Sequence, residues 1–177
     1  MSSSAASPSP FRRLLDVHDA ATTAGFWIAG ACLAAIVCSY VIEVVLRYFL
    51  NAPTSWAGSA VSYLLCVSIF LVLPELTRQR SHIFISVLPD ALSQQRATLL
   101  VKSGYLAGLL ASMLAAWFCA DATYTQYVNQ IETLNEWRVP KWTVSIFIPY
   151  GLASSGLYFL RHVVASESYV AAGSGVA

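Results

Sequence analysis

Four long apolar stretches, with charged residues only near their ends, dominate the chain. They lie within residues 20–46, 57–75, 103–121 and 142–161. A bilayer core about 30 Å thick requires about 20 consecutive apolar residues in a helix that crosses it. Core helices of soluble proteins seldom continue this far without a charge. The pattern therefore predicts an all-α integral membrane protein that folds as a four-helix bundle.

The two ends of the chain differ in composition from its centre. Residues 1–13 and 166–177 are rich in small or turn-forming residues, so we expect flexible tails around a four-span domain at residues 14–165. The first apolar stretch exceeds the roughly 7–15 residues of a signal-peptide core. Bulky and charged residues follow it where a cleavage site would need small ones. We therefore expect it to be retained as a membrane span.

Basic residues are unevenly divided between the two sides that four spans define. Cytoplasmic flanks of membrane helices carry an excess of Lys and Arg. The side that holds both termini carries seven of them, and the opposite side carries three. The seven are Arg12, Arg13, Arg78, Arg80, Arg96, Lys102 and Arg161, and the three are Arg47, Arg138 and Lys141. We therefore expect both termini in the cytoplasm.

The overall composition narrows the functional classes. Apolar residues make up 57% of the chain and charged residues 11%, whereas a typical globular domain contains about 25% charged residues. The formal net charge of +1 argues against a nucleic-acid partner, because nucleic-acid binding needs a concentrated basic face. The cysteines lie inside the apolar stretches, where we expect packing roles rather than redox or zinc chemistry. They are Cys32, Cys38, Cys66 and Cys119.

The segment after the first span combines an ion pair with helix-ending residues. Glu43 and Arg47 are four residues apart, which places them on one helix face. Asn51 and Pro53 then predict the end of the helix, because proline lacks a backbone N–H and restricts the residue before it. Two interpretations stay open for this segment and for Trp56. It is either a capped helix end with an interfacial anchor or a contact with a partner.

The segment between the second and third spans contains His82 behind two arginines. His82 is a candidate proton relay or haem ligand, but a lone histidine at this place more often forms interfacial hydrogen bonds. Glu75 is spaced to reach Arg78 one turn further on. A Pro-Asp pair then suits the start of an amphipathic helix at about residues 90–102. We expect that helix to lie along the cytoplasmic interface before the chain turns into span three.

Further features are expected in the second half of the chain. Span three should continue as a helix beyond Asp121 and break before Pro140. Residues 149–151, a Pro-Tyr-Gly sequence, predict a kink in span four that neighbouring helices must compensate. The small residues that follow allow another helix to approach closely. Gly104 and Gly108 form a GxxxG pattern, which is a weak signal in any apolar helix.

The centres of the four spans contain no Asp, Glu, Lys, Arg or His. Ion-coupled carriers place such residues within their spans, and a haem site would need histidines on facing spans. The sequence therefore predicts no catalytic residue, no metal site and no bound cofactor. We expect a chain of this kind to be the partner of a larger membrane protein rather than an enzyme.

Three short motifs stand at the borders of the spans. After the first span, an RY-x-x-N-x-P-x-x-W pattern is formed by Arg47, Tyr48, Asn51, Pro53 and Trp56. After the second, a basic stretch from Arg78 leads to Ser81, His82 and Ile83. At the start of the fourth stand Pro140 and Trp142, with Pro149 and Gly151 beyond. In this order and on this topology, the motifs resemble those of the small membrane subunits of TRAP-type transporters, the DctQ-like family.

The resemblance implies a three-part secondary transporter of the bacterial inner membrane. A periplasmic solute-binding protein would capture an organic acid and dock transiently, and a large many-helix subunit would move the acid with a sodium gradient. The small subunit would brace the large one within the lipid bilayer. Its motif residues Arg47, Tyr48, Asn51, Pro53 and Trp56 would support the fold and the subunit contacts. No residue of this chain would bind substrate or sodium.

Some positions depart from the family pattern. Gly58 and Ser59 stand where the family commonly has an acid, and Ser81 replaces the usual glycine before the histidine. If that acid pairs with a basic group of the large subunit, the contact differs in this chain. Two alternatives stay open. A four-helix membrane oxidoreductase would need loop cysteines or paired span histidines, and a small self-assembling carrier would normally need an acid within a span.

Overall fold

The computed structural model describes residues 10–52, 54–79, 94–133 and 139–164. Its helices are α1 (Pro10–Phe49), α2 (Ala57–Arg78), α4 (Gln94–Val128), α5 (Lys141–Ser145) and α6 (Phe147–Val164). Four helical segments are long and apolar enough to cross a membrane, since α5 and α6 together form the last one. The predicted all-α architecture with four spans is confirmed, and the chain is a multi-pass membrane protein.

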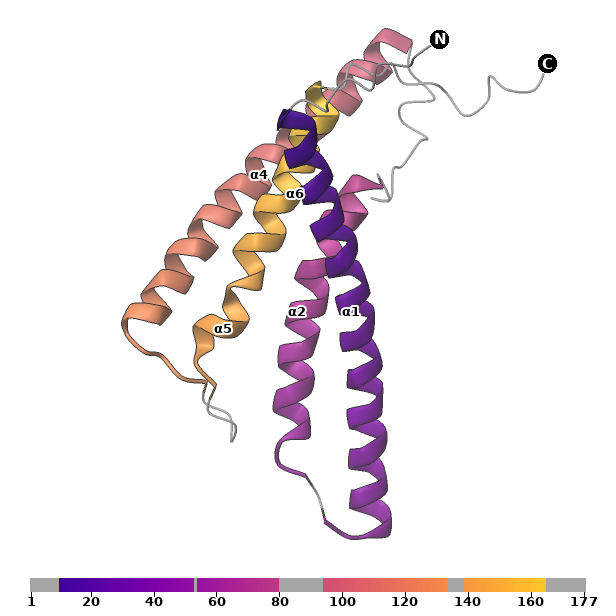
Figure 1. The fold of residues 1–177 in the computed structure, drawn as a ribbon, viewed down its shortest axis with the longest axis vertical. Helices are drawn as coiled ribbons and strands as arrows, with labels where there is room; N and C mark the ends of the chain where they lie inside the picture. Colours follow the sequence, from indigo (N-terminus) through magenta and orange to yellow (C-terminus); the bar gives the residue numbers. More distant parts are fainter. Residues whose placement is uncertain (1–9, 53, 80–93, 134–138, 165–177) are drawn as a thin grey trace, which may run out of the picture.

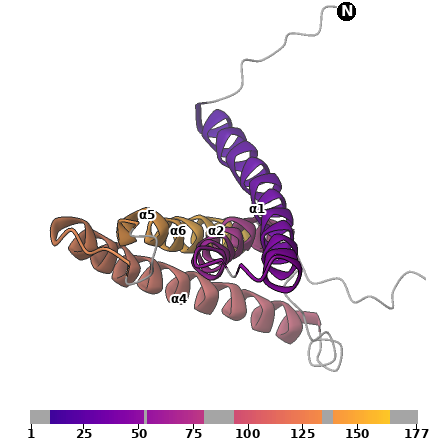
Figure 2. The ribbon, with the colours of Figure 1, turned by 90° about the horizontal axis from the view of Figure 1, so that it is seen from below.

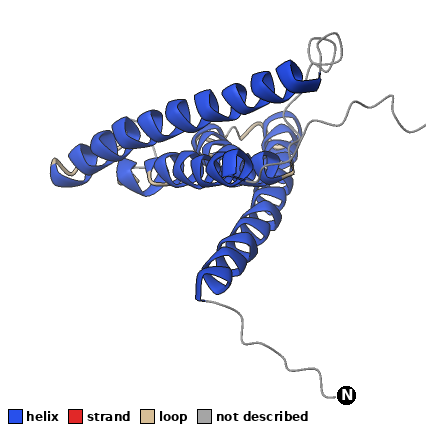
Figure 3. Ribbon diagram, turned by 90° about the horizontal axis from the view of Figure 1, so that it is seen from above, coloured by secondary structure: helices blue, strands red, loops and turns tan. Residues whose placement is uncertain are grey.

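The helices form two antiparallel hairpins, which diverge toward their loop ends (Figure 1). α1 pairs with α2, α4 pairs with α5 and α6, and the hairpins meet mainly through α2 and α6. Seen from below, α2, α6 and α5 stand in a row with α4 running obliquely along one side (Figure 2). The described part consists of helices and connecting loops (Figure 3). α1 begins and α6 ends at the same end of the molecule, and which side is cytoplasmic stays a prediction.

α1 and α4 are longer than a membrane crossing requires. At a rise of about 1.5 Å per residue, the 40 residues of α1 and the 35 residues of α4 extend well past a hydrocarbon core about 30 Å thick. The described part of α1 starts with Pro10, and proline is well tolerated in the first turn of a helix. Residues 10–13, which we assigned to a tail, are therefore helical.

Small residues bring α6 into close contact with its neighbours. A Cβ atom added to Gly151 would lie 2.3 Å from the carbonyl oxygen of Phe70 in α2. That carbonyl has no helical partner, because Pro74 stands four residues later and lacks an N–H. On the other side of α6, a Cβ on Gly156 would lie 2.9 Å from Met113 of α4. The predicted close approach at the small residues of span four is confirmed.

Buried hydroxyl groups complete this interior. Ser68, Thr77, Ser112 and Ser155 each donate a hydrogen bond to a carbonyl three or four residues earlier in the same helix. A hydroxyl satisfied in this way can be buried among apolar groups without leaving an unpaired donor. Small hydroxyl side chains therefore serve the same purpose as glycine and alanine at these helix contacts.

Span four is interrupted at Ile146, between α5 and α6. The proline at position 149 cannot bond the carbonyl of Ser145, and its ring clashes with that carbonyl in a regular helix. The hydroxyl of Thr123 in α4 lies 3.5 Å from the Ser145 oxygen and partly replaces the missing N–H. The kink that we predicted at residues 149–151 therefore lies one turn earlier, because proline acts on the residue four positions before it.

Both long helices end in a residue with left-handed backbone conformation. Asn51 follows α1 with a φ of 49°, and the N–H of Ala52 donates to the carbonyl of Leu46 at 3.1 Å. Gln130 follows α4 with a φ of 48°, and the N–H of Ile131 donates to the carbonyl of Gln126 in the helix at 3.0 Å. Asparagine tolerates this conformation better than most residues. The predicted helix end near Asn51 and the continuation of span three beyond its acidic border are confirmed.

The structure differs from the sequence prediction before span three. Residues 94–102 are the first turns of α4 and run into the span without a bend, so they do not form a separate interfacial helix. No proline or glycine interrupts the hydrogen-bond ladder there. Residues 90–93 lie outside the described chain. In the GxxxG pattern, a Cβ on Gly108 would lie 3.1 Å from Phe159, whereas Gly104 faces open space.

Candidate functional site

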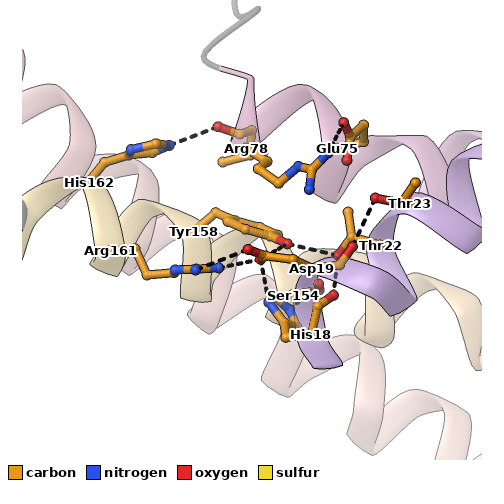
Figure 4. A network of polar contacts seen from close by, with 11 residues as sticks. His18, Asp19, Thr22, Thr23, Glu75, Arg78, Ser154, Tyr158, Arg161 and His162 are labelled. Carbon is orange, nitrogen blue, oxygen red and sulfur yellow. Dashed lines mark hydrogen bonds and ion pairs between the residues drawn. The ribbon is translucent and has the colours of Figure 1, made fainter. Parts of the chain in front are cut away.

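A polar cluster joins α1, α2 and α6 at the end of the molecule where α1 begins and α6 ends (Figure 4). Pairs of its members within each helix are spaced three or four residues apart, which places them on one side of the helix: Asp19 with Thr22, Glu75 with Arg78, and Tyr158 with both Ser154 and Arg161. α1 contributes His18, Asp19 and Thr22, α2 contributes Glu75, Thr77 and Arg78, and α6 contributes Ser154, Tyr158, Arg161 and His162. Two carboxylates and two guanidinium groups leave the cluster balanced in charge.

Tyr158 lies at the centre of the cluster with 2% of its surface exposed. Its hydroxyl group lies 2.8 Å from Oδ1 of Asp19, to which it donates, and 3.0 Å from Oγ1 of Thr22. Arg161 approaches the same carboxylate as a fork, with Nη1 at 2.5 Å from Oδ1 and Nη2 at 3.2 Å from Oδ2. The Arg161 guanidinium also lies over the Tyr158 ring, 5.2 Å from its centre. One carboxylate of α1 thus holds two side chains of α6.

Two histidines tie α6 to the other helices of the cluster. Nε2 of His18 lies 2.8 Å from Oγ of Ser154, and its ring centre lies 4.6 Å from that of Tyr158. Nε2 of His162 donates to the backbone carbonyl of Thr77 in α2 at 3.0 Å. Both imidazoles are therefore engaged in helix contacts.

Glu75 is the most deeply buried charged residue of the cluster, with 3% of its surface exposed. Its Oε1 accepts hydrogen bonds from Arg78 at 2.7 Å and from Gln79 at 2.5 Å, which confirms the predicted pairing of Glu75 with Arg78. Among the described residues, its Oε2 is buried without a hydrogen-bond partner. The carboxylate is therefore held in place from one side, by groups of its own helix.

The motif residues that the sequence singled out lie at the opposite end, around the loop between α1 and α2. Nη2 of Arg47 lies 2.5 Å from Oε1 of Glu43, so the predicted ion pair is confirmed. Tyr48 is 77% exposed, and Asn51 closes the end of α1. Trp56 is half-buried directly before α2. A contact of these residues with a partner stays a prediction, and Pro53 lies outside the described residues.

The remaining predicted residues are divided between the described chain and its gaps. Pro140 is exposed and immediately precedes α5. The ring of Trp142 packs edge-on against Tyr127 with 5.4 Å between the ring centres, so it joins α5 to α4. His82 lies outside the described residues. The motif residues that the structure describes are therefore not gathered into one site.

The contacts of the polar cluster join the helices to one another. Within the described helices, the charged residues and histidines lie toward the helix ends. The described cysteines are free thiols, and the described residues contain no group of three or more His, Cys, Asp or Glu side chains that could hold a metal ion. Most donors and acceptors of the polar cluster bind one another. The sequence did not predict this cluster, because Asp19 and Arg161 stand at the borders of the first and last apolar stretches, 142 positions apart.

Comparison with known proteins places the chain in a family. No curated protein matches it. The family model of the DctQ component of tripartite ATP-independent periplasmic transporters matches residues 36–167, which is more than half of the 177 residues. The matched range contains the motif residues from Arg47 to Trp142 and the α2 and α6 parts of the polar cluster. The chain therefore belongs to the DctQ component family of the tripartite ATP-independent periplasmic transporters.

Proposed function

We propose that this chain is the small membrane subunit of a sodium-driven transporter of the bacterial inner membrane, and that it braces a large transport subunit. That partner takes up an organic acid, which a periplasmic binding protein delivers. The observation that carries the proposal is the family match together with the four spans. The family's description as tripartite and ATP-independent supports two further components and a driving force other than ATP hydrolysis.

The distribution of charge supports a bracing role rather than transport by this chain alone. Groups that bind and release ions during transport lie within the membrane and face a cavity or the bundle interior. In the described helices, the charged residues lie toward the ends, and those of the polar cluster are bound to one another. We place substrate and ion binding in the large subunit.

The outward faces of α1 and α4 support a lateral partner in the membrane. In the most apolar part of α1 and of α4, 6% and 11% of the residues are buried within this chain. The corresponding share is 28% in each of the other two spans. Large side chains such as Trp27, Trp117 and Phe118 are exposed there. Lipid covers apolar faces of this kind, and so does a helical partner. We assign the contact with the large subunit to these peripheral helices and to the loop between α1 and α2.

The proposal is tested by uptake of a radiolabelled organic acid into cells that express the binding protein and the large subunit. We expect sodium-dependent uptake when this chain is co-expressed, and loss of uptake together with reduced recovery of the large subunit when it is omitted. Equal uptake without this chain would contradict the bracing role. A sodium-independent signal would contradict the assigned driving force.

The motif residues offer a finer test of the same proposal. Arg47→Ala and Trp56→Ala each remove a large side chain from the loop end, and we expect both to weaken copurification with the large subunit. The control Arg13→Ala removes an exposed arginine at the opposite end of α1, and the control Trp56→Phe keeps an aromatic ring at the position of the motif tryptophan. Unchanged recovery of the complex and normal uptake in both motif variants would exclude them from the interface.

A further inference from the structure

The two ends of the molecule are held together in different ways. At the loop end the hairpins diverge (Figure 1). At the other end α1 is joined to α6, although no Cα atom of α1 lies within 8 Å of a Cα atom of α6 in the described chain. Long side chains bridge this distance. Tyr158 and Arg161 of α6 reach Asp19 of α1, and we call these three residues the α1–α6 latch. His18 of α1 also reaches Ser154 of α6 in the same region.

The hairpins pack on each other mainly through α2 and α6, and a close backbone contact joins Phe70, near the middle of α2, to Gly151, in the second turn of α6. The carbonyl of Phe70 rests against Gly151, where a Cβ would come within 2.3 Å of the oxygen. Gly151 has no side chain to interlock with α2 at that point, and we take this contact as the place about which one helix rotates slightly on the other. The Phe70–Gly151 contact lies between the α1–α6 latch and the diverging loop ends.

We propose that the α1–α6 latch fixes the angle between the two hairpins about the Phe70–Gly151 contact. The inference rests on the contacts within this chain and is independent of the proposed function. When the latch is closed, the bidentate contact of Arg161 with Asp19 and the Tyr158 hydrogen bond hold α1 against α6. When it is open, the hairpins swing about the glycine contact and the distance between their loop ends varies.

The electrostatics of the latch make it a two-state element. Charges near a membrane interface are costly when unpaired, and a fork-shaped Arg–carboxylate contact requires a defined geometry. A partly closed latch, in which Arg161 does not reach both carboxylate oxygens of Asp19, is therefore stabilised only a little. Asp19 precedes the residues that the family model matches, whereas Tyr158 and Arg161 lie within them. The latch thus joins the matched part of the chain to the first half of α1, which the match does not include.

Distance measurement between spin labels tests the proposal in the full chain, inserted in lipid nanodiscs. The four native cysteines are replaced by alanine. Spin labels are then attached to the thiols introduced by Leu50→Cys and Asn129→Cys, at positions exposed at the two loop ends. We expect one narrow distance distribution for the unmodified latch. Asp19→Asn leaves Arg161 unpaired and should add a second population at a different distance, whereas the charge exchange Asp19→Arg with Arg161→Asp should restore a single one.

Two further variants keep the test decisive. Tyr158→Phe removes one hydroxyl group and keeps the ring, so it reports on the latch even if Asp19→Asn does not fold. It should broaden the distribution less than Asp19→Asn. Glu43→Gln breaks an ion pair within α1 and should change nothing. The proposal is overturned if Tyr158→Phe and any folded Asp19→Asn protein give the distribution of the unmodified latch, or if Glu43→Gln broadens it equally.

Discussion

α2 and α6 differ from α1 and α4 in the side chains that they bury. α2 and α6 form the centre of the molecule, and most of their buried residues are small or carry a hydroxyl group. α1 and α4 lie on the outside and expose large apolar side chains, including Trp27, Phe49 and Trp117. This is the reverse of a soluble bundle, because lipid removes the advantage of burying large apolar groups between helices. Close backbone approach and polar contacts organise the centre instead.

The largest effect is expected where the central helices touch. Gly151→Leu would place a side chain where the Phe70 carbonyl lies, and we expect a loss of about 3 kcal/mol or failure to form the α2–α6 contact. Gly104→Leu is the matched control on a peripheral helix, since nothing lies within 4 Å of an added Cβ there. Thermal unfolding of both variants in detergent measures the difference. Equal melting temperatures would show that the centre is not defined by close approach.

A smaller effect is expected at the α1–α6 latch. Asp19→Asn removes the charge that holds Arg161, and the two side chains are 33% and 32% exposed. Breaking a buried pair costs about 3–5 kcal/mol, and partial exposure reduces this to about 1–2 kcal/mol. The control is Glu43→Gln on the same helix, where the exposed partner Arg47 limits the loss to about 0.3–0.5 kcal/mol. If chemical unfolding gives both variants the same stability, the latch adds nothing beyond a surface pair.

Removal of a single hydroxyl group from the centre should cost less again. Tyr158→Phe deletes a hydrogen bond to Asp19 but leaves the ion pair between Asp19 and Arg161. We therefore expect the free energy of unfolding to fall by about 1 kcal/mol. Tyr150→Phe changes a tyrosine of the same helix that is 42% exposed, and we expect no measurable loss. Chemical unfolding of the two variants measures whether the central hydroxyl group contributes more to stability than the peripheral one. A larger loss for Tyr150→Phe would reverse the comparison.

The smallest effect concerns the break in span four. Pro149→Ala supplies an N–H for the Ser145 carbonyl and should join α5 to α6, with a change in stability below about 1 kcal/mol. Hydrogen exchange at residues 146–150 should become slower. Pro140→Ala, at an exposed position before α5, should leave exchange in that segment unchanged. Faster exchange in Pro149→Ala would show that the break has another cause.

Features that depend on neighbouring residues could be predicted from the sequence. The four spans follow from the length of the apolar stretches, and the pairs Glu43–Arg47 and Glu75–Arg78 follow from helical spacing alone. The helix end near Asn51 follows from the backbone preferences of that segment. The two ion pairs and the helix end are each fixed by groups less than two helical turns apart, and each span is fixed by the hydropathy of a single continuous stretch.

Features that depend on distant residues could not be predicted in the same way. Asp19 and Arg161 are 142 positions apart, and nothing local distinguishes them from ordinary border charges. The sequence did offer one signal for their pairing, since the two residues carry opposite charges and stand at span borders on the same side of the membrane. The close fit of Phe70 to Gly151 required knowledge that α2 and α6 are neighbours, although Pro74 already indicated a free carbonyl. Hydropathy likewise did not show that α4 starts by residue 94 as one continuous helix.

Copurification from native membranes tests the central claim most directly. The chain is tagged at its C-terminus, extracted in a mild detergent, and its associated proteins are identified by mass spectrometry. We predict a stoichiometric, strongly hydrophobic partner with many helices, together with reduced recovery of that partner from Trp56→Ala cells. A chain that is recovered alone, or only with copies of itself, would contradict a role as the bracing subunit of a larger transporter.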